Sequence, residues 1–65
     1  MEYTNSRIRE IIGEYVHNSK HREMLFDRFI DGMSFERIAE KHDMSVRQTK
    51  TIIYKLQVTI FKHLD

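Results

Sequence analysis

The 65-residue sequence has no cysteine, no proline and only two glycines, Gly13 and Gly32. Without cysteine, the chain can form neither a disulfide nor a thiolate metal site. Little alternation of polar and apolar residues and few helix breakers favour an all-α fold. No apolar run approaches the roughly 20 residues that span a bilayer, and no signal-peptide pattern opens the chain. We therefore expect a cytoplasmic protein that contacts no membrane.

The length of the chain is enough for a single domain, which we expect to span residues 1–65. A core this small stabilises a fold by little more than the entropic cost of ordering the chain. Apolar residues recur at helical spacing and predict four helices. We expect the first to begin at Thr4, Asn5 or Ser6 and to end near His17. The others should cover about 20–31, 35–41 and 46–64.

Local signals place the ends of these helices. Gly32 is expected to end the second helix in a left-handed conformation, and Ser34 to cap the third. Asp43 can take a left-handed conformation in the turn that follows. Ser45 and Gln48 have the spacing of a capping box at the start of the last helix. Gly13 falls inside the first helix, where close contact with a neighbouring helix would explain it.

The apolar stripes of the first and last helices predict which sides are buried. The stripe of the first helix comprises Ile8, Ile11, Ile12, Tyr15 and Val16. The stripe of the last helix comprises Thr49, Ile52, Ile53, Leu56, Ile60 and Leu64. The last helix is long enough to extend beyond the third, so we expect its second half to pack on the first helix.

The charge of the chain is unevenly distributed along its length. The first 44 residues hold seven Lys/Arg and nine Asp/Glu, whereas Ser45 to Leu64 hold four basic residues and no acidic one. The net charge of +1 therefore hides a basic last helix on a mildly acidic body. A basic face of this kind is typical of proteins that bind a polyanion, of which nucleic acid is the commonest.

The segment over about 34–56 has the features of a helix-turn-helix motif. Ala39 is a small residue where the two helices would cross, and Met44, Thr49 and Ile52 supply apolar or small groups on the inner side. A polar outer side at the start of the last helix could enter the major groove of DNA. The candidate DNA-binding residues are Ser45, Arg47, Gln48, Lys50, Thr51, Tyr54 and Lys55.

The region from Arg22 to Leu64 resembles region 4 of sigma-70-family sigma factors, and also the helix-turn-helix of LuxR-type regulators. The residues that carry the resemblance are Arg22 to Leu25, Arg28 to Phe35, Ile38 to Glu40 and Asp43 to Arg47. The resemblance covers about two thirds of the chain. The sequence as a whole also resembles short sigma-like proteins of phages and mobile elements.

The resemblance implies sequence-specific binding of double-stranded DNA in transcription regulation. It places Arg47 and Thr51 where bases are contacted and Lys50 where phosphate is contacted. Val46 departs from the arginine usual in primary sigma factors, and Thr49 replaces the usual Ile or Val. Sigma factors also use further regions to grip polymerase and melt promoter DNA, and since these 65 residues hold none, we do not expect a complete sigma factor.

An alternative function is a protein-interaction module that binds RNA polymerase or another protein. Val58 and Phe61 lie off the main stripe of the last helix, so their exposure would provide a surface for such a partner or for a homodimer. No catalytic residues, cofactor or metal site are expected, and the carboxylates are interpreted as surface charge. His17 and His21 have ligand spacing, but a helix break is expected between them.

Overall fold

The computed structural model describes residues 4–63, and within that range the chain forms helices and no strand. Four helices follow one another: α1 (Asn5–Tyr15), α2 (Ser19–Phe29), α3 (Phe35–Lys41) and α4 (Val46–His63). The all-α prediction is therefore confirmed. No helix in this range is long and apolar enough to cross a membrane.

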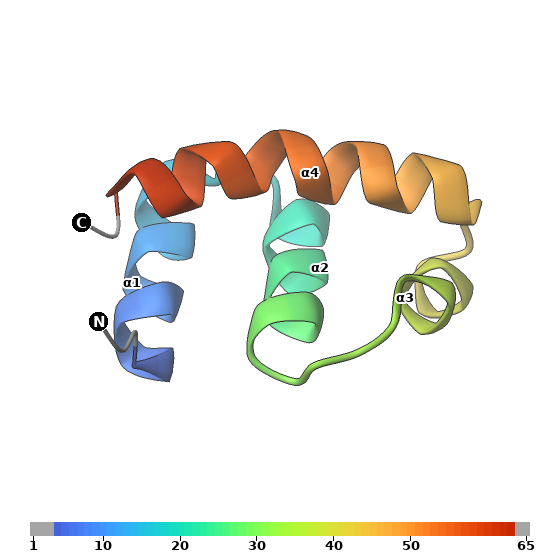
Figure 1. Ribbon diagram of the computed structural model, residues 1–65, viewed down its shortest axis with the longest axis horizontal. Coiled ribbons are helices and arrows are strands. Elements are labelled where there is room, and N and C mark those ends of the chain that lie inside the picture. The colour runs from blue at the N-terminus through green and yellow to red at the C-terminus, as the bar shows by residue number, and fades with distance from the viewer. Residues whose placement is uncertain (1–3, 64–65) are drawn as a thin grey trace.

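The longest helix, α4, lies across the other three helices (Figure 1). Its first half contacts α3, and its second half contacts α1, while α2 packs between them. The described chain measures 31 × 19 × 17 Å along its principal axes. The start of α4 and its end thus lie at opposite ends of the molecule, each supported by a different helix.

Side-chain caps set the start of every helix. Thr4 accepts a hydrogen bond from the Arg7 backbone N–H at 3.1 Å, and Ser34 accepts one from Arg37 at 3.2 Å. Ser45 accepts from the Gln48 N–H at 3.1 Å, as its capping spacing predicts. These bonds satisfy N–H groups that have no partner within the helix.

The boundary between α1 and α2 differs from the prediction by two residues. α1 ends at Tyr15, with Val16 at its C-cap, and α2 begins at Ser19, with Asn18 as its N-cap. The Asn18 side-chain oxygen accepts from the His21 N–H at 3.0 Å. Asn18 and the next residue, Ser19, both favour an N-cap, so residue type alone does not fix the start of α2. α2 also ends earlier than predicted, at Phe29.

Two left-handed residues shape the connections on either side of α3. Gly32 has φ +68°, and the Met33 N–H after it bonds back to the Asp27 carbonyl at 2.9 Å. Asp43 has φ +55°, and the Met44 N–H bonds to the Ala39 carbonyl at 2.9 Å. Both left-handed positions were predicted. Together they reverse the chain in few residues and bring the start of α4 against α3.

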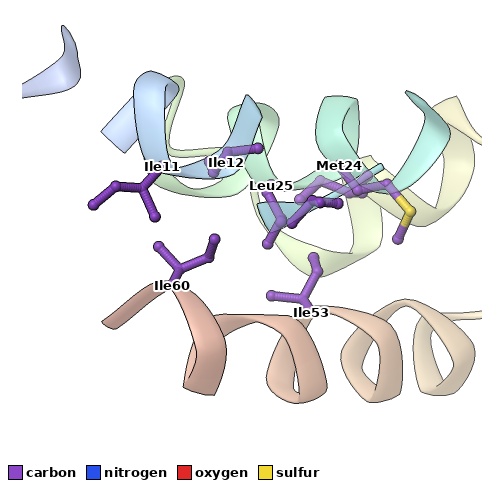
Figure 2. Close-up of a cluster of buried hydrophobic side chains, with 8 residues drawn as sticks. Ile11, Ile12, Met24, Leu25, Ile53 and Ile60 are labelled. Carbon is purple, nitrogen blue, oxygen red and sulfur yellow. The ribbon is translucent and has the colours of Figure 1, made fainter. Parts of the chain in front are cut away.

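The core lies beneath α4, where aliphatic side chains from all four helices meet (Figure 2). Ile53 and Ile60 point from α4 toward Ile11 and Ile12 of α1 and toward α2. The buried members of this cluster are Ile11, Ile12, Val16, Met24, Leu25, Ile38, Ile53 and Ile60. The helical stripes therefore identify the core correctly except at Tyr15, and Leu64 lies outside the described residues.

Two residues of α1 differ from their expected roles. Tyr15 is 41% exposed, because its ring stacks on His63 at a centroid distance of 3.8 Å instead of entering the core. A Cβ added to Gly13 would meet nothing within 4 Å. Close contact with a neighbouring helix therefore does not explain Gly13, and the suggested reason for this glycine is wrong.

Candidate nucleic-acid interface

The start of α4 presents polar side chains on one side and buries small and apolar ones on the other. Thr49 and Ile53 are fully buried, and Met44 and Ile52 are half-buried. The seven candidate residues all lie on exposed positions: Ser45, Arg47, Gln48, Lys50, Thr51, Tyr54 and Lys55. This division follows from the apolar stripe: because Ile53 packs in the core, the opposite side of the helix faces outward.

Thr49 is the one polar side chain on the inner side of this segment that is fully buried. Its hydroxyl donates to the Ser45 carbonyl at 2.9 Å, one turn earlier on the chain. The hydroxyl is therefore satisfied without a partner from another helix, and its methyl group can pack in the core. A buried hydroxyl left without a bond would destabilise the domain by roughly 1–3 kcal/mol.

Four candidate residues gather around an open depression at the beginning of α4. Ser45, Arg47, Gln48 and Thr51 line it together with Ile52. The Thr51 hydroxyl donates to the Arg47 carbonyl at 2.9 Å, which fixes its orientation while leaving its oxygen able to accept a further bond. The depression thus combines a guanidinium, a carboxamide and two hydroxyls within about two turns of helix.

Lys50 and Tyr54 belong to a different group of side chains, centred on Phe35 of α3. The Tyr54 ring meets the Phe35 ring edge-to-face at 5.5 Å, and the Lys50 ammonium lies 5.7 Å from the Phe35 ring centroid. Arg28 of α2 lies closer, at 4.2 Å from the same centroid. The structure therefore places Lys50 and Tyr54 on the flank of α4 nearest α3, and Lys55 stands exposed one turn beyond Thr51.

The electrostatic character of α4 suits an anion. From Val46 to His63 it contains four Lys/Arg and no acidic residue. Among residues 4–63, the ion pairs lie on α1 or join α2 to the end of α3, and none includes Arg47, Lys50 or Lys55. The helix N-terminus adds unpaired N–H groups and the positive end of the helix dipole. These charges are available to an external partner.

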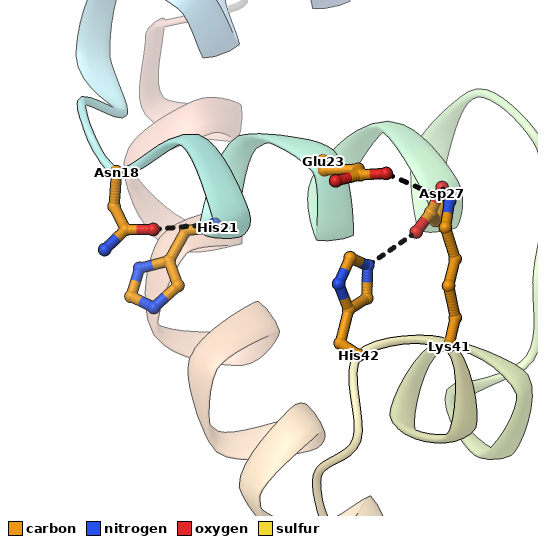
Figure 3. A network of polar contacts seen from close by, with 6 residues as sticks. All are labelled: Asn18, His21, Glu23, Asp27, Lys41 and His42. Carbon is orange, nitrogen blue, oxygen red and sulfur yellow. Dashed lines mark hydrogen bonds and ion pairs between the residues drawn. The ribbon is translucent and has the colours of Figure 1, made fainter.

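A buried polar network lies behind this surface, between α2 and the end of α3 (Figure 3). The Asp27 side chain is 3% exposed and accepts from Lys41 Nζ at 2.9 Å. His42 Nε2 lies 3.1 Å from the other Asp27 oxygen, and Glu23 pairs with Lys41 at 3.3 Å. The network fixes the last residue of α3 and the first residue of the turn that leads to α4.

The interpretation of every carboxylate as surface charge is therefore wrong for Asp27. The only local signal was its position three residues after buried Met24, which places it on the inner side of α2. The hydrogen bond to Asp27, assisted by Glu23 and opposed by desolvation, raises the pKa of Lys41. Lysine is a cation at neutral pH, and the charge of Lys41 beside Asp27 offsets the burial of the carboxylate.

The described residues contain no group of three or more His, Cys, Asp or Glu side chains placed to hold a metal ion. His17 lies in the connection between α1 and α2, and His21 lies in the first turn of α2, so the two do not share a helix. Comparison of the chain with protein-family models, curated proteins and solved structures found no match.

Proposed function

We propose that the chain is a helix-turn-helix DNA-binding domain that acts in transcription regulation. In this proposal, α3 crosses above the DNA backbone and the first turns of α4 enter the major groove. The observation that carries it is the exposed, acid-free side at the start of α4, where Arg47 and Lys50 have no carboxylate partner among residues 4–63. A region 4-like arrangement is part of the same proposal.

The dimensions and chemistry of α4 suit this role. An α-helix with its side chains is about 10–12 Å across, close to the major-groove width of about 12 Å. In the groove, Arg47 could bond the acceptors of guanine, and Gln48 could bond adenine through its carboxamide. Lys50, Lys55 and the Ser45 hydroxyl would contact phosphate and set the register. Base contacts then supply the specificity, and phosphate contacts most of the affinity.

Binding of duplex DNA tests the proposal directly. A selection from a random duplex pool should enrich one sequence, and the doubly substituted R47A/K50A chain should no longer retain it. K62A is the matched control, because Lys62 is exposed on the last turns of α4, far from the depression. We expect K62A to bind nearly as the unsubstituted chain does. Unchanged binding by R47A/K50A, with normal helicity by circular dichroism, would contradict groove reading by α4.

A second candidate function is a protein-interaction module, with RNA polymerase as one candidate partner. It is favoured by the exposure of Val58 (66%) and Phe61 (44%) on the second half of α4. Apolar side chains on an exposed helix face favour contact with another macromolecule. Pull-down of polymerase by the chain, lost in F61E but retained in R47A/K50A, would favour this function over DNA reading.

A further inference from the structure

Ile52 is the one aliphatic side chain among the described residues that line the depression at the start of α4. The others are polar: Ser45, Arg47, Gln48 and Thr51. Ile52 is half-buried and packs in part against the core cluster, whereas Ile53 next to it is fully buried. The part of Ile52 that the core does not cover therefore belongs to the same surface as the polar candidate residues.

Internal hydrogen bonds limit what the polar side chains of the depression can offer to a base. The Thr51 hydroxyl donates its proton to the Arg47 carbonyl, so Thr51 can offer a base only an acceptor oxygen and a methyl group. The Ser45 oxygen accepts from the Gln48 N–H in its capping role. Hydrogen bonds to base edges then come chiefly from the guanidinium of Arg47 and the carboxamide of Gln48. Ile52 and the methyl group of Thr51 form the apolar part of the same depression.

We propose that Ile52 is a specificity-determining residue that contacts the 5-methyl group of a thymine in the bound duplex. The inference rests on the proposed DNA-binding function and names a base that the depression recognises. In the major groove the four bases display hydrogen-bonding atoms, and thymine alone adds an apolar group, its methyl. An aliphatic side chain placed against polar atoms would remove water from them without replacing their bonds. Thymine is therefore the base that Ile52 favours.

The spacing of Gln48 and Ile52 supports contacts to nearby base pairs. Residues four apart lie on one side of a helix, with their Cβ atoms about 5–6 Å apart. Successive base pairs lie about 3.4 Å apart along the DNA. If the carboxamide of Gln48 bonds adenine, the methyl group that Ile52 contacts lies on the same base pair or within about two steps of it. The selected sequence should therefore contain an A·T pair with a thymine methyl close by.

The alternative role for Ile52 is to cover the edge of the core and nothing more. Leu56 provides the comparison, because both side chains are half-buried on α4 and both pack against the core cluster. Of the two, Ile52 lines the depression and Leu56 does not. If covering the core were the whole role of Ile52, replacement of either residue by alanine should affect recognition of thymine alike.

The experiment replaces each thymine of the selected duplex in turn by deoxyuridine, which removes the 5-methyl group and keeps the base pair. Burial of one methyl group corresponds to roughly a fourfold change in affinity. We expect the full chain to bind about fourfold more weakly when one particular thymine is replaced, and equally well when a thymine outside the contacted groove is replaced. Because the protein is the same in every titration, its folding does not enter this comparison.

Substitutions in α4 then assign the effect to a side chain. I52A should bind the thymine and deoxyuridine duplexes alike, I52V should show an intermediate difference, and L56A should keep the full difference. Circular dichroism checks that each variant is folded, and I52V decides the result if I52A is not. A selected sequence without thymine, equal binding of the unsubstituted chain to all deoxyuridine duplexes, or a full difference in I52A or I52V would overturn the role of Ile52 alone. Failure to bind any duplex would overturn the proposed function as well.

Discussion

His42 Nε2 lies 3.1 Å from Asp27 Oδ2, and the two side chains are only 8% and 3% exposed. Fifteen residues separate them in the chain, and the contact joins α2 to the turn that precedes α4. Lys41 completes the group from the end of α3, at 2.9 Å from Asp27 Oδ1. The geometry at the start of α4 thus depends on a carboxylate that contributes no atom to the exposed face.

Removal of the Asp27 charge should destabilise the domain. D27N keeps the shape of the side chain but removes the charge that pairs with Lys41 and turns one of the two acceptors into a donor, and we expect the free energy of unfolding to fall by about 2 kcal/mol. Urea unfolding followed by circular dichroism measures this change. D31N is the control, because Asp31 is exposed just beyond α2. Equal effects of the two substitutions would contradict a structural role for the network.

Lys41 should make stability sensitive to alkaline pH. Its pKa is raised by the hydrogen bond to Asp27, so the folded state holds this proton more tightly than the unfolded state. The resulting stabilisation is fully present below the ordinary lysine pKa of about 10.4 and is lost as pH rises through the raised value. The difference in urea midpoint between the unsubstituted chain and K41M should be constant from neutral pH to about pH 9 and then shrink. An increase in this difference between the two urea midpoints above that pH would contradict a raised pKa of Lys41.

The two glycines should respond in opposite directions to substitution by alanine. Gly13 is exposed inside α1 with open space around its Cβ position, so G13A should stabilise the domain by up to about 1 kcal/mol. Gly32 has φ +68°, where a side chain is strained, so G32A should destabilise it by about 1 kcal/mol. Thermal unfolding should show shifts of several degrees with opposite signs. A lower melting temperature for G13A would reveal a role for Gly13 that its surroundings do not suggest.

The features of the fold that could be predicted from the sequence depend on local chemistry. Ser34 and Ser45 are caps, and Gly32 and Asp43 are left-handed, because each of these roles is decided within a few residues of the chain. The sequence places Val58 and Phe61 off the main stripe of the same helix, and the structure shows that both are exposed. Such signals need no knowledge of what the opposite helix contributes.

The features that could not be predicted depend on contacts between distant segments. Asp27 is buried because Lys41 and His42 reach it from another helix, and a carboxylate on α2 gives no indication of those partners. Tyr15 shares the periodicity of the core, yet it stacks on His63 near the far end of the chain. The division of the candidate site into a depression and a Phe35 cluster likewise depends on how α3 packs against α4.

Gln48 and Lys50 should contribute to DNA binding in different ways. Gln48 lines the depression and would read a base edge, so Q48A should lower affinity for the selected duplex by about tenfold and leave the dependence on salt unchanged. Lys50 would contact phosphate, so K50A should weaken binding to all duplexes alike and reduce the slope of log affinity against log salt concentration by about 1. Titrations of selected and scrambled duplexes at several salt concentrations separate the two effects. A loss of discrimination in K50A with an unchanged slope would instead place the ammonium on a base edge, and would reassign the reading side of α4 from the depression to the flank beside Phe35.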